Sequence, residues 1–268
     1  MVITFLSDFG LQDDFVGTCH GVMKTIAPEV EIIDITHGIP PHNVLQGALV
    51  LCNTLQYMPV GVHLAVVDPG VGSSRRPLAL RSGEGRLLVG PDNGLLIPGA
   101  ERTGGIAEAH ELANPDYALD SVSRTFHGRD LFSPAAAHLA LGVPLGELGP
   151  PVAVDALARI DTPQPEVGEN RIRARILYID RFGNMQLNLT REHLQQADVT
   201  PGMTVEIELA LDRYYAVAAR TFADARPGDF ILYEDAYRNI ALAISGGNAA
   251  EMCGAVAGQE VRIHLHTP

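Results

Sequence analysis

Apolar and polar positions in the first half of the chain follow two different periods. Short β-branched runs at residues 2–6, 30–35 and 62–67 are typical of buried strands. Between them, residues 15–26 and 43–57 carry apolar side chains three and four positions apart, as amphipathic helices do. Strand, helix, strand, helix, strand predicts a parallel sheet with right-handed crossovers.

Further apolar runs extend this first domain. Residues 78–80 and 86–89 are short apolar runs, and residues 131–141 predict a helix. A stretch from 145 to 169 holds several prolines and little periodicity, as a linker would. We therefore expect an α/β domain with a central, mostly parallel sheet over residues 1–150, and a linker over residues 151–170.

The pattern changes to alternation after Arg171. The predicted strands are residues 172–179, 185–189, 205–209, 214–218, 230–233, 240–244 and 261–265. Several short strands with turn residues between them indicate a small barrel or sandwich. We expect a smaller all-β, barrel-like domain over residues 171–268.

Composition and charge limit the partners. The 268 residues carry a formal net charge of −13, and the pI is near 5.1. Nucleic-acid binding needs a clustered basic footprint, and none is apparent. Arg171, Arg173 and Arg175 alternate along one expected strand and are interpreted as one solvated face. A positively charged small substrate is compatible with this balance.

The cysteines and the absence of long apolar runs bear on the compartment. Cys19, Cys52 and Cys253 are far apart and form no C-x-x-C pair, which favours buried thiols in a reducing compartment. No basic and apolar leader precedes the first strand, and no run approaches the ~18 apolar residues of a membrane span. We expect a cytoplasmic protein without membrane contact.

Candidate chemistry centres on Asp68, at the end of the apolar run 62–67. A carboxylate before a Pro/Gly turn lies where an open α/β sheet presents reactive side chains. Two glycines in the turn let Arg75 return towards Asp68, and His127 precedes the helix expected at 131–141. The hypothesis is that an Asp, an Arg and a His converge on one water. Taken singly, the three are ordinary as a turn former, a solvated charge and a loop histidine.

Other polar residues have both a structural and a functional interpretation. Asp8 follows the first strand at the edge where α/β folds bind ligands. Asp13 and Asp14 precede a helix and suit capping, which we favour for Asp14. His37 and His42 lie in one loop, but without a further His or carboxylate at ligand spacing a metal site is the minor alternative.

The last strand carries two more histidines. His264 and His266 share one face of it, and two histidines alone are not a metal site. We expect them on an edge strand.

Five short motifs accompany the Asp68, Arg75 and His127 set. They are Ser-Asp-Phe-Gly at residues 7–10, Pro-Asp-Asn-Gly at 91–94, Asp-Arg-Phe-Gly-Asn at 180–184, Thr-Phe-Ala-Asp-Ala at 221–225 and Gly-Asn-Ala-Ala at 247–250. In this order, and across nearly the whole chain, they resemble the S-adenosyl-L-methionine hydroxide adenosyltransferases. That family is related to fluorinating and chlorinating enzymes.

The resemblance implies a reaction and a set of residues. Water attacks the 5′ carbon of S-adenosylmethionine, with Asp68, Arg75 and His127 as the catalytic groups. Asp8 holds the ribose hydroxyls, His42 lines the pocket, and Asp180 contacts the methionine amino group. The adenine contacts are Phe182, Asn184 and Phe222, and further substrate contacts are Asp13, Phe126 and Ala249. No metal and no cofactor is implied, and the family forms a homotrimer in which the first domain of one subunit faces the second domain of its neighbour.

Two alternatives stay open. One is a chlorinase-like halogenase, although those enzymes lack this Asp, Arg and His set. The other is a non-catalytic sensor that binds adenosine or S-adenosylmethionine. Residues 234–239 also depart from the family, whose members often carry a Ser-containing turn there, so the contact to the methionine carboxylate is not assigned. No G-x-G-x-x-G or Walker loop indicates a nucleotide cofactor.

Overall fold

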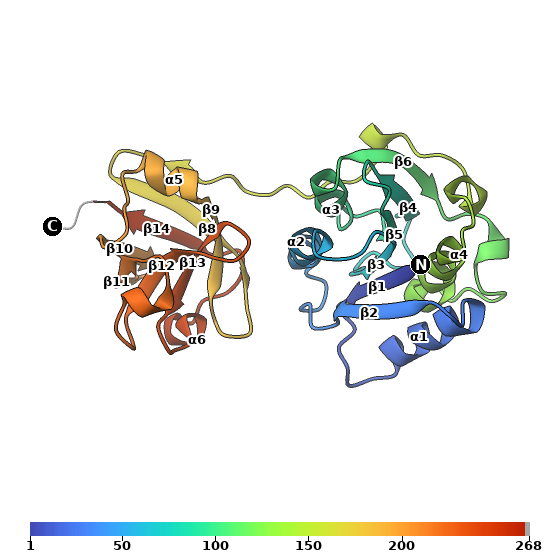
Figure 1. The fold of residues 1–268 in the computed structure, drawn as a ribbon. Helices are drawn as coiled ribbons and strands as arrows, with labels where there is room; N and C mark the ends of the chain where they lie inside the picture. Colours follow the sequence, from blue (N-terminus) through green and yellow to red (C-terminus); the bar gives the residue numbers. More distant parts are fainter. Residues whose placement is uncertain (266–268) are drawn as a thin grey trace. The chain divides into compact units, whose positions relative to one another are not determined.

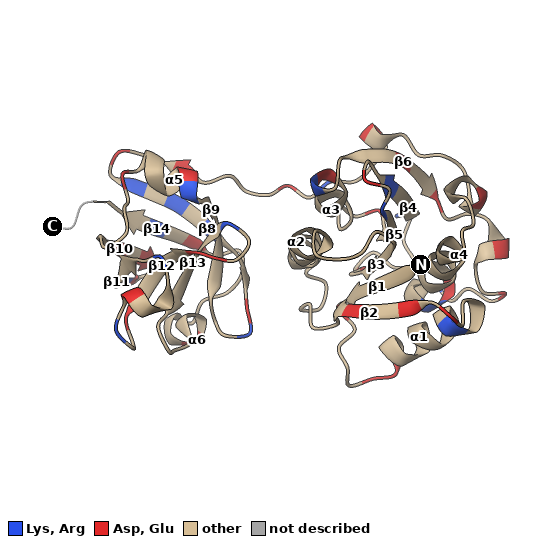
Figure 2. Cartoon of the chain, viewed as in Figure 1, with Lys and Arg blue, Asp and Glu red and all other residues tan. Residues whose placement is uncertain are grey.

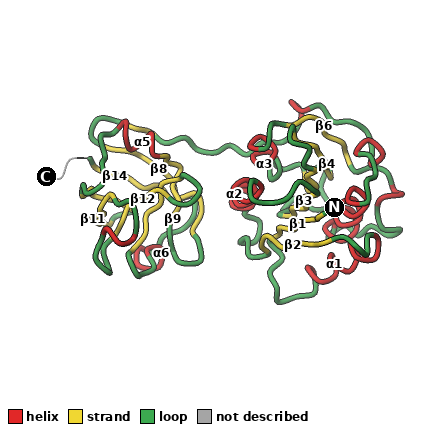
Figure 3. The backbone as a smooth tube through the Cα atoms, viewed as in Figure 1, coloured by secondary structure: helices red, strands yellow, loops and turns green. Residues whose placement is uncertain are grey.

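The computed structural model describes residues 1–265, which form two compact units (Figure 1). The first unit is Met1–Asp161, and the second begins at Thr162. Figure 3 shows helices and strands mixed in the first unit, whereas strands dominate the second. Each unit is described separately.

The described part of the first unit is built on a sheet with strand order β2-β1-β3-β5-β4-β6. The strands are β1 (Val2–Ser7), β2 (Glu31–Thr36), β3 (Val62–Val66), β4 (Pro77–Ser82), β5 (Leu87–Pro91) and β6 (Ile106–Glu111). The pairings of β1 with β2, β1 with β3 and β3 with β5 are parallel, and β4 runs antiparallel to β5 and β6. The prediction of a mostly parallel sheet is confirmed.

Helices cover both faces of this sheet. They are α1 (Phe15–Ile26), α2 (Val44–Leu55), α3 (Ile97–Arg102) and α4 (Ser133–Ala140), with short helical turns η1 (Pro115–Tyr117), η2 (Gly128–Phe132), η3 (Leu145–Leu148) and η4 (Val154–Ala156). Phe5 of β1 packs with α1 and α4 residues, whereas the next residue, Leu6, packs with α2 residues. Successive strand residues point to opposite faces, so a strand buried on both sides reads as a continuous apolar run.

Part of the expected linker packs onto the first unit. The backbone amide of Val152 donates to Ala109 at 2.8 Å, and Leu157 is buried. The Ala158 amide donates to the Asp92 carboxylate at 2.9 Å. The chain therefore leaves the first unit at Asp161 rather than near residue 150.

The second unit is a barrel whose described strands close into a ring, in the order β14-β10-β11-β12-β13-β9-β8 with β14 pairing back onto β8. The strands are β8 (Arg171–Ile179), β9 (Met185–Thr190), β10 (Thr204–Leu209), β11 (Asp212–Ala218), β12 (Phe230–Glu234), β13 (Asn239–Ile244) and β14 (Glu260–His264), and β7 (Glu166–Val167) adds to the side of β8. Helices α5 (Arg191–Gln196) and α6 (Ala249–Cys253) and the turn η5 (Phe222–Asp224) complete the unit. The prediction of a barrel-like all-β domain is confirmed.

Closure of the ring overturns one expectation. β14 pairs with β10 on one side and β8 on the other, so His264 does not lie on an edge strand. Its imidazole contacts the Glu208 carboxylate at 2.9 Å. The prediction was wrong because pairing with strands some 55 to 90 positions away leaves no local pattern. His266 lies outside the described residues.

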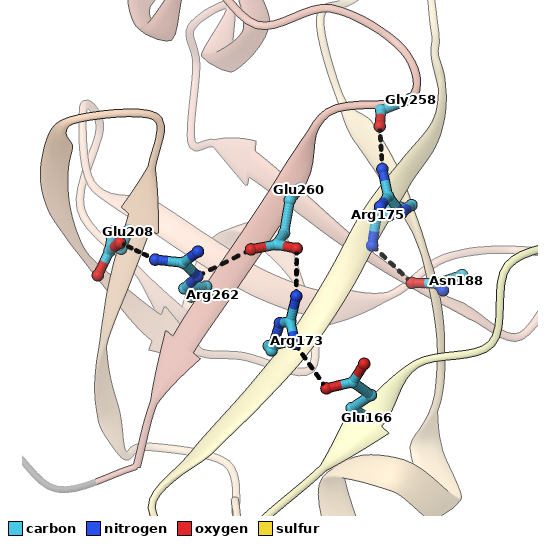
Figure 4. A network of polar contacts seen from close by, with 8 residues as sticks. All are labelled: Glu166, Arg173, Arg175, Asn188, Glu208, Gly258, Glu260 and Arg262. Carbon is cyan, nitrogen blue, oxygen red and sulfur yellow. Dashed lines mark hydrogen bonds and ion pairs between the residues drawn. The ribbon is translucent and has the colours of Figure 1, made fainter.

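Arg173, one of the alternating arginines on β8, belongs to a network of ion pairs (Figure 4). Arg173 bonds Glu166 and Glu260, both at 2.9 Å, and Arg262 bonds Glu260 at 2.8 Å and Glu208 at 2.7 Å. Arg173 is therefore paired across strands rather than simply solvated. Acidic residues accompany basic ones in both units (Figure 2). Across residues 1–265, no helix combines the length and the apolar character needed to cross a membrane.

Candidate functional site

An arginine and a carboxylate pair at the carboxyl end of β3. Asp68 follows the buried residues Val66 and Val67, and the chain then turns back over the next residues. The Arg75 Nε donates to Asp68 Oδ1 at 3.0 Å, and Arg75 Nη2 donates to Oδ2. Both side chains are at least nine-tenths buried, so the bidentate pair is held in a single orientation.

Glycine makes this turn possible. Gly72 has φ of +77°, and a Cβ there would lie 2.5 Å from the carbonyl oxygen of Arg124. A side chain would thus meet both strain and a clash. The close approach brings the turn against the segment that precedes His127.

His127 completes the cluster as the structure shows it. Arg75 Nη2 lies 2.8 Å from His127 Nδ1. A guanidinium can only donate, so Nδ1 accepts and the ring proton lies on Nε2. Partial burial, and next the neighbouring Arg75 charge, lower the pKa of His127. His127 is therefore a neutral ring that offers an Nε2–H donor, and the positive charge of the cluster resides on Arg75.

The loop that carries His127 is anchored by a buried carboxylate. Asp130 is fully buried in η2, where it accepts from the backbone amide of Ser123 at 2.8 Å and pairs with Arg129. Burial opposes its ionisation, but hydrogen bonds from Arg129 and Ser123 prevail and lower the pKa of Asp130. The Arg129 guanidinium in turn lies 5.1 Å from the ring centre of Phe126. These contacts fix the position of His127 relative to Arg75.

A second carboxylate lies at the same edge of the sheet. Asp8 follows β1, which pairs in parallel with β3, so the residues after both strands emerge side by side. Asp8 Oδ2 accepts from the backbone amide of His42 at 2.8 Å. His42 has φ of +67°, an unusual conformation for a residue with a side chain. The structure thus brings Asp8 and His42 together.

The acids before α1 differ from expectation in detail. Asp14 occupies the N-cap position of α1, but its side chain makes no capping bond to the backbone. Its carboxylate accepts instead from the Thr18 hydroxyl at 3.2 Å. Asp14 therefore holds the expected capping position, where its charge complements the helix dipole without a side-chain capping bond. Asp13 is exposed in the preceding loop.

The Pro-Asp-Asn-Gly motif supports the same edge. Asn93 Nδ2 donates to the carbonyl of Val67 at 2.9 Å, directly before Asp68. Asp92 is held by Arg76, whose Nε lies 2.9 Å from its Oδ2. The motif therefore supports the backbone that presents Asp68.

In the second unit, Asp180 organises the turn between β8 and β9. Its Oδ1 accepts from the backbone amides of Phe182 at 2.8 Å and Asn184 at 2.9 Å, and its Oδ2 accepts from Asn184 Nδ2 at 2.8 Å. The bond from Asn184 Nδ2 also fixes the direction in which the side-chain carbonyl oxygen of Asn184 points. Asp180 and Asn184 therefore form one rigid unit.

The same turn packs closely against the start of α6. A Cβ on Gly183 would lie 1.8 Å from Asn248 Oδ1, and the Ala250 amide donates to the Gly183 carbonyl at 3.0 Å. Ala249 is fully buried behind this contact, where it packs in the barrel core. The Gly-Asn-Ala-Ala motif thus supports the turn of Asp180 from within.

Two aromatic rings of the second unit are left accessible. Phe182 is exposed to 76% and Phe222 to 41%, unusually high values for phenylalanine. The Phe222 ring lies 4.9 Å from that of Tyr233. Exposed rings of this kind can stack on a planar ligand.

Sequence reasoning did not single out the polar groups that surround Asp180. Burial raises the pKa of Tyr233 to about 12, and the field of Asp180 adds to it. Burial, followed by the field of Asp235, likewise raises the pKa of Tyr178 to about 12. Burial also raises the pKa of Asp235. A repeated signal was present, because Tyr178 precedes Asp180 and Tyr233 precedes Asp235 by two positions, each pair spanning the end of a strand.

Comparison with known proteins identifies the family. Residues 3–149 match the model of the SAM hydroxide adenosyltransferase N-terminal domain, and residues 174–262 match that of the C-terminal domain. A protein of Salinispora arenicola (strain CNS-205) named (R)-S-adenosyl-L-methionine hydrolase is 45% identical over 261 residues, which cover 97% of each chain. A protein of Actinoplanes sp. (strain N902-109) named fluorinase is 31% identical and covers 98% of this chain and 97% of its own.

The fold agrees with a solved structure as well. An uncharacterized conserved protein from Thermotoga maritima has a TM-score of 0.90 and 33% sequence identity, with 98% of this chain and 99% of that chain covered. The family models match both units, and the relatives match nearly the full length. The chain therefore belongs to the SAM hydroxide adenosyltransferase family.

Proposed function

We propose that this protein hydrolyses S-adenosyl-L-methionine to adenosine and L-methionine, by in-line attack of water on the ribose 5′ carbon. The observation that carries the proposal is the contact set of Asp68, Arg75 and His127 at the end of β3. It occurs in a chain whose relative at 45% identity is named (R)-S-adenosyl-L-methionine hydrolase. The reaction needs no cofactor.

The chemistry of the substrate defines what the residues must do. A sulfonium leaves as a neutral thioether, so the leaving group needs no acid. Catalysis must instead place a water in line with the carbon–sulfur bond and stabilise its developing hydroxide character. Bulk water has a pKa of ~15.7, so a carboxylate is too weak a base to deprotonate it to any extent. Positioning and electrostatic stabilisation therefore dominate the catalysis.

Each catalytic group has a separate role in this scheme. Asp68 accepts a hydrogen bond from the water, using lone pairs that the bidentate pair with Arg75 leaves over. Arg75 supplies the positive charge near the developing hydroxide. His127 donates from Nε2–H, since its Nδ1 accepts from Arg75.

Substrate binding is assigned to the remaining candidate residues. Asp8 accepts from the ribose hydroxyls, and Asp180 receives the methionine amino group. Phe182 and Phe222 stack on adenine, and Asn184 bonds its edge. Further contacts are assigned to Asp13, His42 and Phe126, whereas Ala249, which is fully buried, supports the turn of Asp180 instead. The acidic and phenolic groups around Asp180 suit a cationic substrate, although the partner of the methionine carboxylate stays unassigned.

The test of the reaction is turnover in oxygen-18 water. We expect the label in the 5′ hydroxyl of adenosine and none in methionine, because water attacks carbon and the carbon–sulfur bond breaks. The measurement is mass spectrometry of both products. Release of adenine, or of adenosine without label, would contradict the mechanism.

A second candidate function follows from the fluorinase relative. If the chain were a halogenase, saturating chloride would yield 5′-chloroadenosine in excess over adenosine. We expect adenosine as the main product at every chloride concentration, because Asp68 and Arg75 fill the nucleophile site with a water-binding pair. A protein that binds S-adenosylmethionine without any product would be a sensor instead.

Assembly and compartment complete the proposal. We propose a homotrimer with sites shared between subunits, which rests on the family resemblance. We propose a cytoplasmic location, supported by Cys19, Cys52 and Cys253, all free thiols in the described chain. Sedimentation equilibrium should give a mass three times that of the 28.7 kDa chain. A monomeric mass in a fully active sample would refute the shared site.

A further inference from the structure

A cluster of two histidines and one aspartate lies apart from the groups assigned to catalysis. His20 comes from α1, Asp34 from β2 and His37 from the loop after β2. One ligand atom of each lies within 4.8 Å of the others. In the sequence, the loop of His37 and His42 showed no further metal ligand at a suitable spacing. The fold brings His20 and Asp34 to His37.

The distances suit a small divalent cation. Asp34 Oδ1 lies 2.9 Å from His20 Nε2 and 3.0 Å from His37 Nε2. In a tetrahedral zinc site with bonds of 2.0–2.1 Å, neighbouring ligand atoms are about 3.3 Å apart. Asp34 is therefore close enough to both imidazoles to share one ion with them, and the ligand atoms of the two histidines lie within 4.8 Å of one another.

His37 is the residue that a hydrogen-bonded cluster explains least well. Its side chain is only 2% exposed, and its Nε2 has no hydrogen-bond partner among the described residues, because the contact to Asp34 lacks hydrogen-bond geometry. A buried ring nitrogen without a partner is uncommon in a native protein. It lies 3.0 Å from the Asp34 carboxylate, the oxygen ligand that the cluster offers to an ion.

The other nitrogen of His37 is held as metal-binding histidines usually are. Nδ1 lies 2.7 Å from the Ser7 hydroxyl, and the Phe5 ring packs edge-on against the imidazole at 4.7 Å between ring centres. With an ion on Nε2, the Nδ1–H donates to Ser7 Oγ. Such a contact fixes the tautomer and the ring orientation of a ligand.

We propose that His20, Asp34 and His37 form a binding site for a divalent cation of the zinc type. Two imidazoles and one carboxylate match the preference of such ions, and water completes the coordination at the partly exposed side of His20. The site braces the elements around Asp8. Ser7 precedes Asp8, and the Gly10 amide donates to the His37 carbonyl at 2.8 Å.

Cobalt titration of the full-length protein, freed of metal with a chelator, tests the site. Co²⁺ in a site of this type gives visible absorption bands, which we expect to saturate at one equivalent per chain. Zinc should displace the cobalt, and calorimetry should give the zinc affinity. Asp34→Asn and His37→Asn should each weaken binding by at least ~10-fold, since each removes a direct ligand.

The chain offers a matched control. His264 lies 2.9 Å from Glu208 in a similar pair, but Arg262 also contacts that carboxylate at 2.7 Å and supplies the positive charge. His264→Gln should leave cobalt binding unchanged. If His37→Asn does not fold, His20→Gln at the partly exposed position on α1 carries the test. The proposal would be overturned if cobalt gave no visible bands, or if the wild type and the ligand variants bound cobalt with equal affinity. The three residues would then form a hydrogen-bonded cluster only. Neither result depends on hydrolase activity.

Discussion

Asp68→Asn is expected to lower turnover of S-adenosylmethionine by ~10²-fold or more while substrate affinity changes little. The substitution keeps the size of the side chain but removes the negative charge and one acceptor from the pair with Arg75. The lost interaction acts on the attacking water, which matters in the transition state far more than in the bound ground state. Single-turnover kinetics, together with calorimetric binding, separates the two effects.

Arg75→Ala should give a loss of the same order, because it removes both the partner of Asp68 and the charge near the developing hydroxide. Glu108→Gln is the matched control, since Glu108 forms an ion pair with Arg81 at 2.9 Å on the same sheet. It should leave turnover unchanged. Near-normal turnover in Asp68→Asn would return this residue to the role of a turn former.

Asn184→Ala should have the opposite kinetic signature, with affinity reduced ~10-fold or more and turnover of bound substrate largely kept. The amide both bonds Asp180, at 2.8 Å, and is assigned to the adenine edge. Removing it loosens the turn and leaves adenine without its partner. Calorimetry with S-adenosylmethionine and with adenosine measures the change.

Asn188→Ala serves as the control for this variant. Asn188 lies on β9, and its side chain bonds the backbone of Arg175 and Pro163 instead of the turn at Asp180. We expect unchanged affinity in this control. Unchanged affinity in Asn184→Ala would disprove the adenine assignment.

The elements that sequence predicts well are those with a strong local pattern. The run before Asp68 is apolar and is followed by a turn signal, so the strand and its end are predicted correctly. The structure places Arg75 and His127 against Asp68. α3 and β6 were not predicted, because α3 has only six residues and β6 reads Ile-Ala-Glu-Ala-His-Glu, with little apolar character. Short elements are stabilised by tertiary contacts more than by propensity.

Clusters built from distant segments were beyond local reasoning. The group of Tyr178, Asp180, Tyr233 and Asp235 comes from the ends of β8 and β12, which lie near one another only in the folded barrel, with β13 and β9 between them. The contact of His37 with His20 and Asp34 depends on how α1 lies beside β2. In both cases the residue types were visible, but long-range pairing decides which of them meet.

Closure of the barrel affects the behaviour of the chain at high concentration. An open sheet offers unpaired backbone groups at its edges, where a second molecule can add a strand and start aggregation. Among the described residues of the second unit, the ring of strands offers no such template, and β7, which lies outside the ring, is only two residues long. The outer strands of the first unit, β2 and β6, carry acidic residues, including Glu31 and Glu108. The repulsion between these like charges would oppose pairing of an edge strand of one molecule with that of another. Both units are thus protected against edge-to-edge strand pairing between molecules.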